Sequence, residues 1–269
     1  MHRFLRLASL VSGFLYTLLA LGFAFQISWV VALFPWNLSY LSAIFIASIL
    51  LAIAIPTLWI GWKGEIGSVF GGAIDLTVTF IGMGVFSIQL YFGDTSRQSI
   101  LVFGILALLS AAALAGIAWK SWGIALKDKR PTPRFVRISF ALFAVTLLLA
   151  GGALILKTNN IFPWNIGEEL RVLYGWIFLG AMCYFIFALI KPQWGNAKGQ
   201  LMGFLAYDLV LIVPFLQHFE DVIPEQRLSL TIYVGVMVFS GVLAAYFLFI
   251  DKRMSLFSAS GNEGRPMQR

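Results

Sequence analysis

The chain carries little charge and few residues of the kinds that bind metals or form disulfides. Only 12% of its 269 residues are charged and 60% are hydrophobic, whereas an ordinary soluble domain has about 25% charged residues. A soluble fold of this length could not hide so many apolar side chains, so lipid is expected to surround most of the chain. The single cysteine, Cys183, excludes a disulfide framework and a cysteine metal site.

Motifs of several enzyme classes are also missing. The sequence has no phosphate-binding P-loop, no His-Glu-x-x-His and no Gly-x-Ser-x-Gly. Its two histidines, His2 and His218, are too few for a haem or di-iron site inside a helix bundle. We therefore predict no catalytic residue, no metal and no cofactor. A lipid-modifying enzyme that uses only Asp residues stays open.

Eight apolar segments predict an all-α protein that crosses the membrane several times. A helix of about 20 apolar residues spans the ~30 Å hydrocarbon layer, and each segment approaches or exceeds that length between boundaries of charge, Pro, Gly or Asn. The expected spans are roughly 7–33, 38–61, 66–92, 98–119, 135–156, 167–190, 200–219 and 229–250.

The basic residues gather on one side of the predicted spans. The side that holds the N-terminus has fifteen of the nineteen Lys and Arg residues. The other side has four: Arg97, Lys157, Arg171 and Arg227. The positive-inside rule then predicts cytoplasmic termini and an inner (plasma) membrane protein of a bacterium. Insertion and contact with anionic lipid explain the net charge of +7, so no nucleic-acid partner is expected.

The two halves of the chain resemble each other. Phe34-Pro35-Trp36-Asn37 recurs 128 residues later as Phe162-Pro163-Trp164-Asn165. Further matches at an offset of 132 join Trp62, Gly67 and Gly71 to Trp194, Gly199 and Gly203. An even number of spans in each half predicts two parallel four-helix repeats about an axis along the membrane normal. The expected units are 1–128 and 129–253, followed by a disordered cytoplasmic tail at 254–269.

The repeated Phe-Pro-Trp-Asn element is expected between the first and second spans of each half. Pro ends a helix, Trp suits the headgroup region with its N–H toward water, and Asn caps the next helix. In the second copy, Glu168 would stand at the third helical position of a capping box. The functional alternative is an outer vestibule lined by the Trp and Asn side chains and by other polar residues near the outer ends. The vestibule candidates are Trp36, Asn37, Gln89, Trp164, Asn165, Gln217 and His218.

Two acidic residues are expected near the middle of the membrane. Asp75 follows Gly67 and Gly71 on one helix face, and Asp208 follows Gly199 and Gly203 with one extra residue. Glycines four apart allow close helix packing, and a carboxylate at this depth should face the bundle interior or a wet cavity. Each Asp is either part of a proton or cation relay or a protonated group that joins helices through Tyr, Thr or Ser.

A Pro-Trp turn followed by a helix with Gly-Trp occurs at Pro163-Trp164 and Gly175-Trp176. In this the second half resembles uncharacterised multi-spanning bacterial membrane proteins. The resemblance implies an integral membrane protein and no particular activity.

Three functions remain open. Midplane carboxylates in a duplicated fold favour a small-solute or ion transporter, with Asp75 and Asp208 at the repeat interface. The scarcity of polar residues favours instead a scaffold or sensor that packs against another membrane protein. A lipid-handling enzyme is the third possibility. A transporter predicts a wet cavity that reaches both Asp residues, a scaffold a dry core, and an enzyme an opening toward lipid at the carboxylates.

Overall fold

The computed structural model describes residues 2–256, which form helices and no strand. Eight helices, some extended by a short turn of another helix type, are long and apolar enough to cross a membrane, as the sequence predicts. The long helices are α1 (His2–Ala24), α3 (Tyr40–Lys63), α4 (Val69–Gly93), α5 (Gln98–Ser121), α6 (Arg134–Ile155), α7 (Glu168–Ile190), α8 (Trp194–Gln217) and α9 (Pro224–Ala245).

Four short elements complete the described part of the chain. The α-helical turn α2 (Ser28–Val31) follows α1, and the 3-10 turn η1 (Ile66–Ser68) leads into α4. The 3-10 turn η2 (His218–Glu220) continues α8, and the π-helical turn η3 (Tyr246–Ile250) continues α9. The turns η1, η2 and η3 lengthen the spans formed by α4, α8 and α9, respectively.

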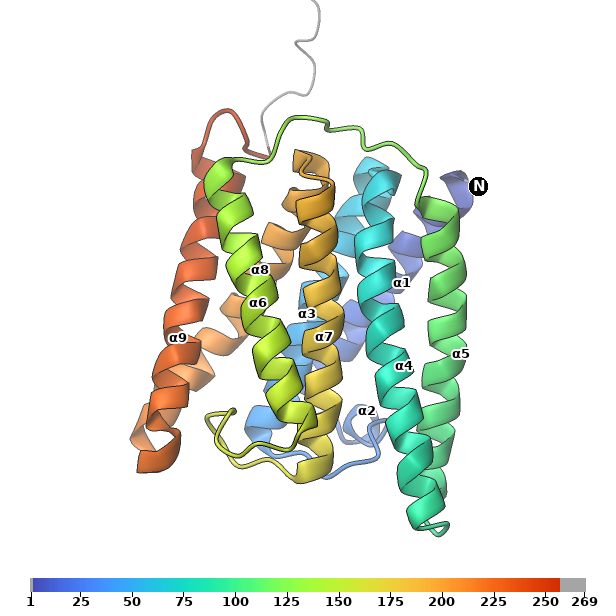
Figure 1. Cartoon of the computed structure of the whole chain (residues 1–269), viewed down its shortest axis with the longest axis vertical. Helices are drawn as coiled ribbons and strands as arrows, with labels where there is room; N and C mark the ends of the chain where they lie inside the picture. The colour runs from blue at the N-terminus through green and yellow to red at the C-terminus, as the bar shows by residue number, and fades with distance from the viewer. Residues whose placement is uncertain (1, 257–269) are drawn as a thin grey trace, which may run out of the picture.

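The long helices form two layers of four (Figure 1). One layer runs α1, α3, α8, α9, and the other runs α5, α4, α7, α6, each helix packing on the next. The inner pairs α3–α8 and α4–α7 join the first half of the chain to the second, whereas α3–α4 and α7–α8 make little contact between the layers. Each layer therefore takes one helix hairpin from each half.

These contacts fit a two-fold relation between the halves. If α1, α3, α4 and α5 are matched in order with α6, α7, α8 and α9, every major helix pair has a counterpart. The pair α3–α8, for example, corresponds to α7–α4. The duplication itself stays a prediction.

Glycines bring the backbones of three hairpins together. A Cβ on Gly175 of α7 would lie 2.8 Å from the carbonyl oxygen of Gly151 on α6, so only glycine allows this approach. A similar pair, Gly84 with Gly104, joins α4 to α5, and between α1 and α3 the glycines Gly13 and Gly61 each lie close to a leucine of the other helix, Leu58 and Leu10. Hairpin α8–α9 has no such pair among the described residues and packs less closely than the other three.

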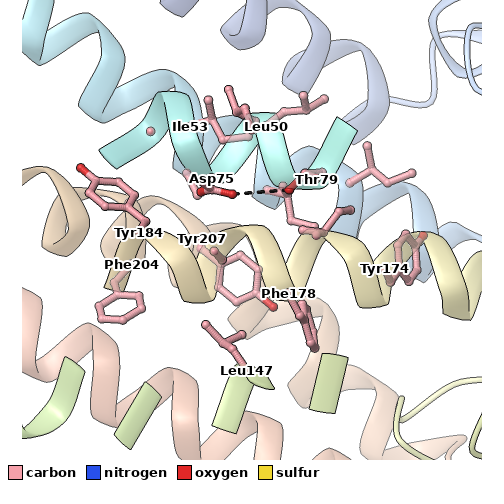
Figure 2. A pocket seen from close by; sticks show the side chains of 18 of the residues that line it. Leu50, Ile53, Asp75, Thr79, Leu147, Tyr174, Phe178, Tyr184, Phe204 and Tyr207 are labelled. Carbon is pink, nitrogen blue, oxygen red and sulfur yellow. Dashed lines mark hydrogen bonds between the residues drawn. The ribbon is translucent and has the colours of Figure 1, made fainter. Parts of the chain in front are cut away.

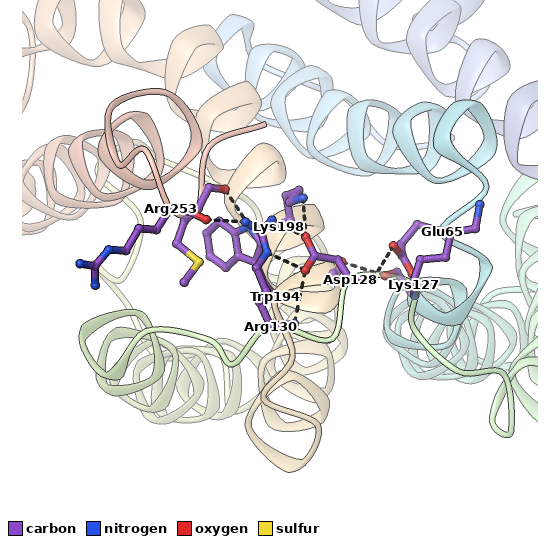
Figure 3. Close-up of polar contacts among 10 residues, drawn as sticks. Glu65, Lys127, Asp128, Arg130, Trp194, Lys198 and Arg253 are labelled. Atoms are coloured by element: carbon purple, nitrogen blue, oxygen red, sulfur yellow. Dashed lines mark hydrogen bonds and ion pairs between the residues drawn. The ribbon is translucent and has the colours of Figure 1, made fainter. Parts of the chain in front are cut away.

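A polar cluster holds the linker between the halves (Figure 3), which runs at the end of the bundle that carries the N-terminus (Figure 1). Asp128 accepts hydrogen bonds from Arg130 Nη2 at 2.6 Å and from Lys198 Nζ at 3.0 Å. Glu65, which is buried, accepts the backbone N–H groups of Lys127 and Asp128. Burial opposes the charge on Asp128, but these hydrogen bonds and cations outweigh it and lower its pKa to about 2. The cluster fixes the linker against η1 and α8.

Several predicted boundaries differ from the structure, and α1 and α9 begin earlier than expected, at His2 and Pro224. The first span ends at Ala24 and not at 33, because the chain turns at Gln26, which has a φ of 50°. Helix α8 begins at Trp194 and not at 200, since the charge of Lys198 is neutralised by Asp128. Of the predicted disordered tail, residues 257–269 lie outside the described part. Residues 254–256 pack back on the bundle, where Met254 accepts a hydrogen bond from Trp194 Nε1.

Candidate functional site

A cavity of about 890 Å³ lies between the two layers. All eight long helices contribute side chains to it, and most of these side chains are apolar. Both Asp75 and Asp208 line it, from α4 and α8 respectively. The sequence did not reveal that these helices belong to different layers. The two predicted carboxylates thus share one cavity, which the sparse contact between the layers leaves open.

Asp75 projects from α4 toward α7 (Figure 2). A Cβ on Gly180 of α7 would lie 2.7 Å from Asp75 Oδ1, so glycine leaves the room for this carboxyl group. Its hydrogen bond comes from Thr79 Oγ1 at 3.5 Å, one turn along the same helix, and is long. The side chain is half-buried and borders the cavity. Asp75 therefore has a weak internal partner and room for another.

Asp208 is held between α8 and α9. The Ser240 hydroxyl of α9 lies 2.8 Å from Asp208 Oδ2, which agrees with the predicted helix-joining role. The other oxygen, Oδ1, is buried and has no hydrogen-bond partner. An unpaired buried carboxylate oxygen is unfavourable. Helix joining thus accounts for only one of the two oxygens.

The cavity reaches the outside of the bundle between α6 and α9. Residues that line it there are also exposed on the surface, among them Thr146 on α6 and Leu228 and Ile232 on α9. Closer to the N-terminal face, the rings of Phe143 and Phe239 close the gap between these helices, with centroids 6.1 Å apart. This opening, which we call the α6/α9 opening, faces the region that lipid would occupy.

The two Trp residues of the repeated element bind across the halves. Trp36 Nε1 donates to Glu169 Oε2 in the first turn of α7 at 2.7 Å. Trp164 Nε1 donates to Ser42 Oγ in the first turn of α3 at 3.0 Å. The prediction that these N–H groups face water is wrong, because each finds a protein acceptor in the opposite half. The element has a structural role in both copies.

The predicted Asn caps are also wrong. Helix α3 begins at Tyr40, and its N-cap is Ser39, whose hydroxyl accepts the N–H of Ser42. Helix α7 begins at Glu168 itself, with Gly167 as its N-cap. Since both helices start three residues after the Asn, Asn37 and Asn165 lie in exposed loop instead.

The vestibule candidates do not form one group. Trp164, Asn165 and His218 line a second cavity of about 440 Å³ at the end of the bundle opposite the N-terminus. The other four, Trp36, Asn37, Gln89 and Gln217, line neither cavity. His218 Nε2 lies 2.8 Å from the carbonyl oxygen of Pro163, in place of the acids beside it in the sequence. No group of three metal-ligating side chains occurs within residues 2–256.

Sequence reasoning missed several polar residues of the large cavity. Tyr16 on α1, Tyr184 on α7 and Ser240 on α9 all line it. None belongs to the repeated motifs, so no sequence signal separated them from the many other Tyr and Ser residues. Tyr207 precedes Asp208 in the sequence and also lines the cavity.

No family model, curated protein or solved structure matches the chain. The cavity and its lining residues are therefore the features of the chain that indicate a function.

Proposed function

We propose that the protein is a membrane transporter whose solute occupies the cavity between the two helix layers, in contact with Asp75 and Asp208. The observation that carries the proposal is that one cavity of about 890 Å³ reaches both carboxylates. Sites between repeated helix units near the bilayer centre are common in transporters. The volume also lies within the usual range of ligand pockets, about 300–1,000 Å³.

The lipid-handling enzyme remains the second candidate, because the α6/α9 opening gives lipid a path to the cavity. It is the weaker proposal. The carboxylates come from different layers, and the cavity has no His or Cys that could serve as base or nucleophile among its described lining residues. A scaffold accounts least well for a cavity of this size.

Thermal unfolding of the purified protein in a non-ionic detergent tests the proposal. The protein is screened against ions and small solutes, together with the variants Asp75→Asn and Asp208→Asn. Asp94→Asn, which changes an exposed loop residue outside the cavity lining, is the matched control. A solute bound to the folded state raises the midpoint by mass action. We expect a solute that stabilises the wild type and the control but neither cavity variant.

The contrary result is the absence of any response across the screen, with both cavity variants at least as stable as the wild type. The two Asp residues would then be structural, and the scaffold would replace the transporter.

A further inference from the structure

We propose that the cavity selects cationic amphiphiles, compounds with a hydrocarbon body and one protonated amine, which reach it from the lipid through the α6/α9 opening. This inference rests on the proposed function and adds to it the chemical class of the solute. It follows from the apolar lining, from the sign of the charges, from the remaining hydrogen-bond capacity of the two carboxylates and from the position of the opening.

The apolar lining of the cavity favours a solute whose main part is hydrocarbon. Around the carboxylate of Asp75, side chains such as Ile53, Leu147, Phe178 and Phe204 face the cavity (Figure 2). Apolar surface of this extent is best covered by hydrocarbon, which gains roughly 25 cal/mol per Å² on leaving water. A bare metal ion would lack ligands here, since Ca²⁺ takes about 6–8 oxygen atoms and Mg²⁺ about six. The solute is therefore mostly apolar.

The charges of the lining have one sign. The ionisable acids are Asp75, Asp208 and, near the opening, Glu225. No Lys, Arg or His is found among the described residues that line the cavity. Like charges in an apolar setting repel strongly and opposite charges attract. An anionic lipid or fatty acid is thus disfavoured, and a cation is favoured.

Both carboxylates have acceptor capacity left for a donor. Asp208 Oδ1 is buried and has no partner, and the hydrogen bond that Asp75 accepts from Thr79 is 3.5 Å long. A protonated primary amine offers three N–H donors, as the Lys ammonium does. Hydrogen bonds between charged groups are about twice as strong as neutral ones. An ammonium head beside Asp75 would donate a shorter and stronger hydrogen bond than the one from Thr79.

The opening sets the route. Leu228 and Ile232 border the cavity and are 71% and 54% exposed on the surface of α9. Helix α9 packs on α8 without a close glycine pair and meets α6 near the N-terminal face through Phe239. An amphiphile dissolved in the membrane meets this opening without first crossing water. Lateral access suits a solute that partitions into lipid.

Site-specific labelling tests the inference. Gly72 lines the cavity, and a Cβ placed there meets no atom within 4 Å, so Gly72→Cys in a Cys183→Ala background gives a reporter thiol. Its rate of modification by N-ethylmaleimide is measured in nanodiscs with dodecylamine, dodecanol or dodecanoate. The chain is the same in all three, and an alkylamine with a pKa near that of Lys, about 10.4, is protonated at neutral pH. Only the head group then differs in charge.

We expect dodecylamine to protect the thiol at a concentration at least about tenfold lower than dodecanol, which corresponds to about 1.4 kcal/mol, and dodecanoate to protect least. Adding Asp75→Asn or Asp208→Asn should remove the advantage of the amine, whereas Asp94→Asn should keep it. Equal protection by all three compounds would overturn the charge selection and leave the transporter intact. If none protects, the amphiphile inference fails. The transporter proposal fails with it only if the solute screen also gives no response.

Discussion

Individual side chains hold this protein together mainly across its two halves. The N–H groups of Trp36 and Trp164 bind the first turns of α7 and α3, so each half supplies a donor to the other. Lys198 of the second half binds Asp128 of the first. In a bilayer these polar contacts are rare and specific, because the apolar faces of helices find lipid almost as favourable as each other. Specificity at the residue scale therefore comes from a few hydrogen bonds.

Asp128 should make stability depend on pH. Its pKa in the folded protein is about 2, below the ordinary value of 3.8. The ionised form is thus favoured by folding, and the stabilisation is present above about pH 4 and lost as the pH falls toward 2. The shift corresponds to about 2 kcal/mol. We expect Asp128→Asn to unfold at lower temperature than the wild type at pH 6.

The measurement is thermal unfolding in detergent between pH 6 and 2. The difference between the wild type and Asp128→Asn should shrink as the pH falls, whereas Asp221→Asn, in an exposed turn at the other end of the bundle, should give no such difference. A constant difference at every pH would show that the charge of Asp128 does not stabilise the fold.

At the scale of helices, close glycine contacts distinguish the three tightly packed hairpins from the more loosely packed hairpin α8–α9. Replacing Gly175 by Ala places a methyl group 2.8 Å from the carbonyl oxygen of Gly151 and 3.1 Å from the backbone nitrogen of Ile155. Backbone atoms cannot rotate away as a side chain would, so α6 and α7 must separate. We expect a loss of about 1–3 kcal/mol, as for other overpacked sites.

Gly152→Ala is the matched control, since a Cβ at Gly152 meets nothing within 4 Å. It should leave stability unchanged or raise it by up to about 1 kcal/mol through helix propensity. Unfolding midpoints of both variants in detergent decide the matter. Equal midpoints for the two would contradict the close contact between α6 and α7.

For the whole molecule, sequence predicted the number and nature of the helices but not their arrangement. Eight long apolar runs were sufficient for the spans, because length against bilayer thickness is a strong constraint. The two layers depend on which helix faces meet, and helices that are apolar on all sides give no such signal. Apart from glycines that allow close packing, no feature of the sequence predicted that α3 pairs with α8 and α4 with α7.

The candidate site was predictable only in its carboxylates. Asp75 and Asp208 stood out because acids are rare in apolar spans, and both line the cavity. Ser240 and Tyr184 did not stand out, since hydroxyl residues are tolerated in membrane helices anywhere. The Asn caps failed because Ser39 and Gly167 lie nearer to the helix starts.

Orientation in the membrane is a prediction for the molecule as a whole. The linker 122–133 and the N-terminus lie at one end of the bundle (Figure 1), and the basic residues there should face the cytoplasm. In a Cys183→Ala background, a membrane-impermeant maleimide should label Ser96→Cys in intact cells and Lys129→Cys only after lysis. Both positions are exposed on loops at opposite ends. Labelling of Lys129→Cys alone in intact cells would reverse the orientation.

Because each layer combines one hairpin from each half of the chain, neither layer can form until the second half has been synthesised. Helices α3 and α4 leave the ribosome well before α8 and α7, their partners from the second half. Until then, the face of α4 that carries Asp75 and the turn of α3 that carries Ser42 lack the groups that later cover them. We therefore expect the first half made alone to expose these polar groups in the membrane, and to associate with other proteins more readily than the complete chain does.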